Sequence, residues 1–222
     1  TPATITTVDG ATVSFTSGAL GKIWGGQFVG GLTSTNRILN TMSFGGDTSF
    51  KNFLGLVRLE ANSTVRFINI PGGAAGGSDN TTFEFIGTTS VVTRDAATVR
   101  LGHIIGGSQT SGIDGATTAG VIDTYILGGR NIDSTFQGYI RGSNNVVKIG
   151  SGKLTFDGAN VTTNTDSATY TNYFYASLLG YSMNTTVSNG TLGIVVPNNL
   201  SNSPTVTLAS SAAILDVSKM GF

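Results

Sequence analysis

Short runs of alternating apolar and polar residues, separated by glycine-rich turns, run along the whole chain and are clearest between residues 134 and 160. Alternation with a period of two places every second side chain on one face of a strand. Glycine and asparagine in the turns supply the positive-φ corners that β-branched residues avoid. Strands this short bury a continuous core only when successive coils stack on one another. The side chains expected to point into such a core are Phe136, Ile140, Val147, Ile149, Leu154 and Phe156.

Three segments of this region resemble a known repeat. They are Ser134–Ser143 (STFQGYIRGS), Val147–Asn160 (VKIGSGKLTFDGAN) and Thr185–Leu192 (TTVSNGTL). In this order they are similar to the autotransporter-associated β-strand repeat, and the match covers residues 126–196. The resemblance implies a right-handed parallel β-helix that bacteria export to the cell surface. It implies no particular activity.

The chain departs from that repeat at residues 163–183, which we interpret as an insertion between the second and third segments. Its aromatic residues recur at helical spacing, so a short helix is expected there. Exposed aromatic rings bind sugars and anchor protein interfaces. The candidate contact surface therefore consists of Tyr170, Tyr173, Phe174 and Tyr181. The alternative, which we favour, is a helix that lays these rings on the solenoid wall.

A second segment, residues 47–62, is ambiguous. Phe50, Phe53, Leu54 and Val57 recur at helical spacing behind Asp47, a good N-cap residue, whereas the run 56–59 also suits a strand. The remaining elements read as strands, with no domain boundary. The sequence thus predicts a single domain, residues 1–222, with an all-β fold. We expect a right-handed parallel β-helix (β-solenoid) with one or two short helical decorations.

The composition limits the classes of partner. Charged residues make up 11% of the chain, and twelve basic and twelve acidic residues cancel without forming a run of either sign. An electrostatic surface for nucleic acid is therefore not expected. No apolar run is long enough for a membrane span, and there is no cysteine. With few titratable groups, stability is expected to be nearly constant between about pH 5 and 9.

The residues that carry enzyme chemistry are sparse. His103 is the only histidine and lies in a strand-like run, where a structural role is the expected one. The segment 150–153 (GSGK) lacks the first glycine and the Ser/Thr of a phosphate-binding loop. Carboxylates are scattered, although stacking of coils can bring two together, for example Asp123 and Asp157. The sequence therefore predicts no catalytic, cofactor-binding or metal-binding residues, and no cofactor.

The functional expectation is a non-enzymatic structural or adhesive module of a secreted or bacterial cell-surface protein. The opening at Thr1, without methionine or an apolar leader, is as expected for a secreted chain whose signal peptide has been removed, or for a trimmed one. Apolar terminal strands predict self-association or incorporation into a larger surface assembly. The alternative is a polysaccharide lyase, a glycoside hydrolase or a carbohydrate-binding β-helix, with carbohydrate as the partner.

Overall fold

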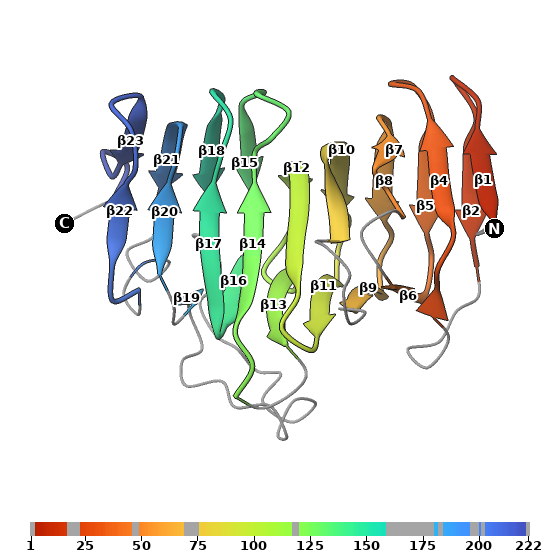
Figure 1. Cartoon of the computed structure of the whole chain (residues 1–222), viewed down its shortest axis with the longest axis horizontal. Coiled ribbons are helices and arrows are strands. Elements are labelled where there is room, and N and C mark those ends of the chain that lie inside the picture. The colour runs from red at the N-terminus through yellow and green to blue at the C-terminus, as the bar shows by residue number, and fades with distance from the viewer. Residues whose placement is uncertain are drawn as a thin grey trace.

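The computed structural model describes residues 3–16, 23–45, 49–68, 76–116, 120–158, 180–181, 184–195, 200 and 203–220. Every helix or strand assigned within these ranges is a strand, and every pair of strands is parallel. The strands stack along the long axis of the molecule, with the two termini at opposite ends (Figure 1). Because each strand pairs with its counterpart one turn away, the chain forms a β-solenoid of about seven turns. The predicted all-β, parallel solenoid is confirmed.

Each complete turn contributes one strand to each of three walls. The first wall contains β1 (Thr4–Thr7), β4 (Gln27–Gly30), β7 (Asn52–Phe53), β14 (Asp123–Leu127), β17 (Asn144–Lys148), β20 (Thr185–Val187) and β22 (Val206–Leu208). The second contains β2 (Thr12–Phe15), β5 (Thr35–Ile38), β8 (Leu56–Leu59), β15 (Ser134–Phe136), β18 (Lys153–Phe156), β21 (Gly190–Ile194) and β23 (Ala213–Asp216). The third contains β3 (Ile23–Trp24), β6 (Thr41–Gly45), β9 (Ser63–Ile68), β11 (Thr89–Arg94), β13 (Gly112–Ala116), β16 (Tyr139–Gly142) and β19 (Gly180–Tyr181). Two long strands, β10 (Gly76–Phe85) and β12 (Thr98–Gly106), run through the first and second walls without a break.

Inward side chains of successive turns stack in rows, and these rows form the core. In the second wall Ile38, Leu59 and Phe85 follow one another in register, and Phe136, Phe156 and Ile194 continue the row beyond Gly106. All six side chains are buried. Each such burial stabilises the fold by about 1.5–3 kcal/mol. The core is therefore a continuous column and not a set of separate hairpins.

The register locates the insertion. Asp123 pairs with Asn144, 21 residues later, whereas Val146 pairs with Thr185, 39 residues later. The additional residues of the longer turn come between β18 and β20 in the chain. Gly180 and Tyr181, which the prediction places inside the insertion, form β19 and pair with Arg141 and Gly142 of β16. The last part of the predicted insertion thus belongs to the third wall.

The helical interpretation of residues 47–62 is wrong. The segment carries β7 and β8, and Phe50, Phe53 and Val57 are all fully buried in the solenoid. Their helix-like spacing arises because the chain turns a corner between the two strands, which shifts the phase of the inward positions. No helix occurs in the described part of the chain, so the expected helical decorations have no counterpart there. In those same residues there is accordingly no helix of the length and apolarity that crossing a membrane requires.

The predicted core is correct at four of its six positions. Phe136, Ile140, Leu154 and Phe156 are at most 3% exposed. Strand β17 has the opposite phase to the one predicted, because Val146 and Lys148 are buried whereas Val147 and Ile149 are only half-buried. The structure therefore places a lysine, Lys148, in the interior row.

Candidate functional site

A polar groove crosses the outside of the third wall, at its corner with the second wall. It encloses about 220 Å³ and spans four successive turns. Its lining residues are Asn62, Ser63, Thr64, Thr88, Thr89, Ser90, Thr110 and Tyr139. The lining thus consists of hydroxyl groups, one carboxamide and one aromatic ring, and it contains no charged side chain.

The strand register explains the shape of this groove. Thr64, Ser90, Gly112 and Tyr139 occupy one row across β9, β11, β13 and β16. The hydroxyls of Thr64 and Ser90 lie 3.1 Å apart and share a hydrogen bond. Gly112 leaves a gap in the row, and the ring of Tyr139 fills it: a Cβ at residue 112 would lie 2.2 Å from Cε2 of that ring. The missing side chain at Gly112 therefore lets Tyr139 lean toward Ser90 and wall the groove.

A second line of hydroxyls lies in the turns before β11 and β13. Thr88 Oγ1 donates a hydrogen bond to Thr110 Oγ1 at 2.9 Å, and the hydroxyls of Ser108 and Thr110 lie 3.1 Å apart. Ser108 Oγ in turn donates to the carbonyl of Gly87. These contacts join the corners of two successive turns and hold the hydroxyls of Thr88 and Thr110 at the mouth of the groove.

A buried ion pair between Arg141 and Asp114 packs against the ring of Tyr139. Arg141 Nε donates to Asp114 Oδ1 at 2.5 Å, and both side chains are at most 4% exposed. The guanidinium carbon of Arg141 lies 4.5 Å from the centre of the Tyr139 ring, a cation–π contact. Burial raises the pKa of the Asp114 carboxyl, and the charge of Arg141 opposes that rise. Because Asp114 and Arg141 are cross-strand neighbours, the pair fixes both the register of β13 and β16 and the position of the ring.

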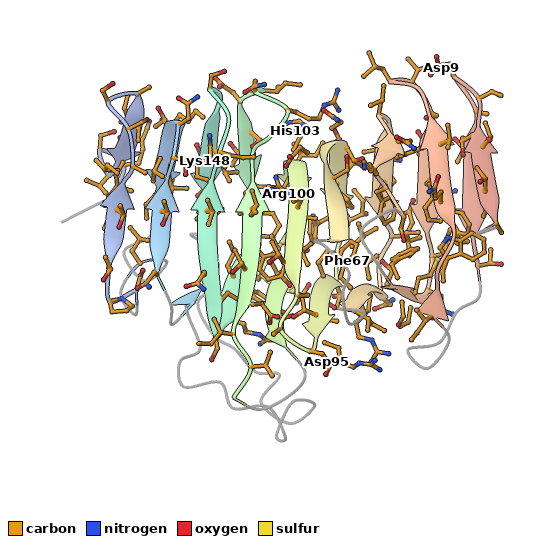
Figure 2. The ribbon with its side chains drawn as sticks, viewed as in Figure 1. Asp9, Phe67, Asp95, Arg100, His103 and Lys148 are labelled. Atoms are coloured by element: carbon orange, nitrogen blue, oxygen red, sulfur yellow. The ribbon has the colours of Figure 1, made fainter. Side chains whose placement is uncertain are left out.

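Lys148 occupies a different kind of site, inside a corner between the first and second walls (Figure 2). Its stem continues the interior row between Leu127 and Val187. Its ammonium group donates to three main-chain carbonyls, those of Ile149, Gly150 and Asn189, at 2.6, 2.8 and 3.2 Å. Burial lowers the pKa of Lys148 to about 8, and the negative charge of Asp133 opposes the shift.

The outer faces of the first and second walls carry most of the remaining charge. Ion pairs there join residues on different turns: Arg37–Glu60, Arg58–Glu84, Arg100–Asp79 and Lys153–Asp216, with separations of 2.6–2.7 Å. His103 lies on the same surface, not far from Arg100 (Figure 2). Its Nδ1 is 3.2 Å from Thr82 Oγ1, and burial lowers its pKa. These contacts connect turns, and the two ring nitrogens of His103 lie against the Thr82 hydroxyl and the main-chain carbonyl of Asp133.

The structure separates the carboxylates that the sequence left open as a pair. Asp123 is fully buried at the start of β14, where its carboxylate accepts the Ala97 N–H. Asp157 follows the end of β18, at the far side of the second wall. No group of three or more metal-binding side chains occurs among the residues that the structure describes. The GSGK segment, 150–153, forms a corner of the solenoid, where its Gly150 carbonyl accepts from Lys148.

The aromatic contact surface predicted in the insertion stays a prediction. Tyr170, Tyr173 and Phe174 lie outside the described residues, and for Tyr181 only the main-chain pairing with Gly142 is described. The groove, by contrast, was not predicted, because its lining comes from four turns that are far apart in sequence. The available signal is a recurrence of hydroxyl residues at one corner, at 63–64, 88–90 and 110–111.

No family model, curated protein or solved structure matches this chain. The fold and the groove are therefore the observations from which a function has to be argued. The fold is that of a β-solenoid built from repeated turns, which is the coarse part of what the repeat resemblance implies.

Proposed function

We propose that the chain is a non-enzymatic structural and adhesive module of a secreted or bacterial cell-surface protein, related to proteins with the autotransporter-associated β-strand repeat. The residues that resemble the repeat supply consecutive stacked turns, since β15 pairs with β18 and β18 with β21. Parallel stacking of this kind makes a stiff rod with long outer walls. Such walls present binding surfaces at fixed spacing.

The observation that carries this proposal is the use of charge. In five ion pairs, a carboxylate on one turn bonds a basic side chain on another; these carboxylates are Glu60, Asp79, Glu84, Asp114 and Asp216. Glycoside-bond chemistry uses two carboxyls that flank one bond at about 5–10 Å. Here the carboxylates connect turns instead, and each exposed pair adds roughly 0.2–1 kcal/mol. Their arrangement favours a scaffold over a hydrolytic centre.

The edge formed by β22 and β23 supports the assembly part of the proposal. Within the described residues these two strands are hydrogen-bonded on one side only, to β20 and β21. Leu208, Ile214 and Val217 are 52%, 53% and 37% exposed on them or beside them. An unpaired strand edge with apolar side chains is a template for a further strand. We propose that a second copy of the chain stacks there, head to tail.

Sedimentation velocity tests the assembly. Lysine at Ile214 and Val217 places two positive charges at the edge, and the Ile214→Lys/Val217→Lys chain is expected to sediment more slowly than the wild type at equal concentration. The matched control carries lysine at Ile122 and Ile132, which are 47% and 46% exposed and lie away from that edge. It should sediment like the wild type. A wild-type chain that is monomeric at tens of micromolar overturns the stacking proposal.

The non-enzymatic part has its own test. The chain is incubated with neutral and acidic polysaccharides, and new reducing ends and unsaturated uronate products are measured over a day. No turnover above a heat-denatured sample is expected. Turnover that saturates with substrate overturns the scaffold proposal in favour of a hydrolase or lyase.

Adhesion is tested with beads that carry the covalently attached chain, washed under flow over a layer of bacterial cells. More beads are expected to remain with the folded chain than with the same chain unfolded in urea before attachment. Equal retention of the two overturns the adhesive role.

A further inference from the structure

We propose that the groove on the third wall is a binding subsite for an uncharged sugar unit of a glycan, with Tyr139 as its aromatic wall. This inference rests on the adhesive function proposed above and names the class of ligand. It assigns recognition of the glycan to the groove residues of four turns and not to the aromatic residues of the insertion.

The chemistry of the lining selects the ligand. Sugar hydroxyls both donate and accept hydrogen bonds, and the hydroxyls of Thr64, Ser90, Thr88 and Thr110 do the same. Neighbouring turns repeat at about 4.8 Å, so these hydroxyls offer partners at regular intervals across the groove. Ser63 and Thr89 border the groove, but they are buried and share the inward side of β9 and β11 with Val65 and Val91, so the ligand contacts come from the outward hydroxyls.

The same lining disfavours other ligands. It has no lysine, arginine or histidine to bind a phosphate, sulfate or carboxylate, and no carboxylate to bind a metal ion. A peptide added as a strand needs a free sheet edge, whereas β9, β11 and β13 are each paired on both sides. A lipid chain needs an apolar lining, and seven of the eight lining residues are polar and not aromatic. A neutral polyhydroxylated ligand is the class that remains.

Tyr139 supplies the contact that hydroxyl groups cannot. The ring offers a flat apolar surface to the C–H groups of a sugar, and its phenolic oxygen adds a donor and acceptor. Arg141 holds the ring in place at 4.5 Å, and the absent side chain of Gly112 lets it lean over the row. Holding the ring before binding reduces the entropy lost on association. Arg141 and Gly112 are thus positioning residues, and Tyr139 is the ligand contact.

The test uses the full chain and titrates it with uncharged tetrasaccharides of glucose, mannose, galactose and N-acetylglucosamine. Isothermal titration calorimetry gives Kd, and saturation-transfer NMR identifies the sugar protons in contact. A heparin tetrasaccharide and tetragalacturonate serve as charged comparators. We expect at least one uncharged tetrasaccharide to bind and the charged ones to bind more weakly.

Four variants locate the binding. Tyr139→Ala and Gly112→Ala remove or displace the ring, and each is expected to raise Kd about tenfold or more. Tyr139→Phe keeps the ring and should have an intermediate effect. Thr110→Val removes a groove hydroxyl and should also raise Kd, whereas its matched control Thr207→Val, at an exposed position of β22, should leave Kd unchanged. Circular dichroism and melting confirm that each variant is folded. If Gly112→Ala unfolds, the Kd values of Tyr139→Phe and Thr110→Val still show whether the sugar binds in the groove.

Several outcomes overturn the inference: no binding of any uncharged tetrasaccharide, preference for a charged one, or an affinity that Tyr139→Ala and Thr110→Val leave unchanged. The bead assay separates this failure from failure of the proposed function. When the titrations fail in this way and wild-type beads still adhere to cells, adhesion occurs through another surface, so the groove inference is overturned and the adhesive role stays intact.

Discussion

Lys148 is expected to make the stability of the solenoid rise in alkaline solution. Its pKa is about 8 in the folded chain, against 10.5 for an unperturbed lysine. Between these two values the unfolded chain binds more protons than the folded one, so stability increases with pH. The difference corresponds to a total gain of about 3 kcal/mol between pH 7 and 11. Below pH 8 the cost of burying the ammonium group is fully present.

The assay is urea unfolding of the wild type and of Lys148→Met, followed by circular dichroism at pH 7, 8, 9, 10 and 11 and constant ionic strength. Methionine continues the row between Leu127 and Val187 but carries no charge. The difference between the two profiles cancels the contribution of the other titrating groups, and its change with pH does not contain the constant offset from the lost hydrogen bonds to carbonyls. That difference should rise by about 3 kcal/mol across the range.

The matched control is Lys219→Met, the same substitution at an exposed position. Its pH profile should run parallel to that of the wild type. A wild-type profile that stays parallel to that of Lys148→Met refutes the reasoning, because the interior lysine would then keep its ordinary affinity for protons. A rise beginning near pH 8 would in turn replace the expectation, drawn from composition, of constant stability up to about pH 9.

Three further predictions test other parts of the structure. Val146→Ala is expected to cost about 2 kcal/mol and Val147→Ala well under about 1 kcal/mol, because only the first points inward; equal losses in urea unfolding contradict the phase of β17. Asp114→Asn or Arg141→Met alone is expected to cost about 3–5 kcal/mol, and the double variant clearly less than the sum, which a double-mutant cycle measures. Deletion of residues 163–179, which keeps β19, should preserve the β-sheet circular dichroism. The preceding turn is complete with about twenty fewer residues than the turn that contains this segment. Loss of the β-sheet signal would show that the segment belongs to the core.

Parts of the candidate site have no signature in the sequence. Tyr139 is an ordinary strand residue until Gly112 and Arg141 lie beside it, and those contacts depend on which strands are neighbours. Asp114 and Arg141 are 27 residues apart and reveal their pairing only through the register of β13 and β16. Hydroxyl residues are common throughout the chain, so their recurrence at one corner identifies no groove by itself.

The sequence by itself indicated short strands that bury a core only when stacked, through its period-two alternation and frequent glycine corners. The parallel β-helix followed from the resemblance of residues 126–196 to a known repeat. It also indicated the burial of Leu154 and Phe156. The phase of β17 and the elements in residues 47–62 were decided only by the tertiary structure. Each corner resets which residues face inward, so spacing measured across a corner misleads. The ammonium group of an interior lysine such as Lys148 finds hydrogen-bond acceptors only where folding brings three main-chain carbonyls from two turns to one point.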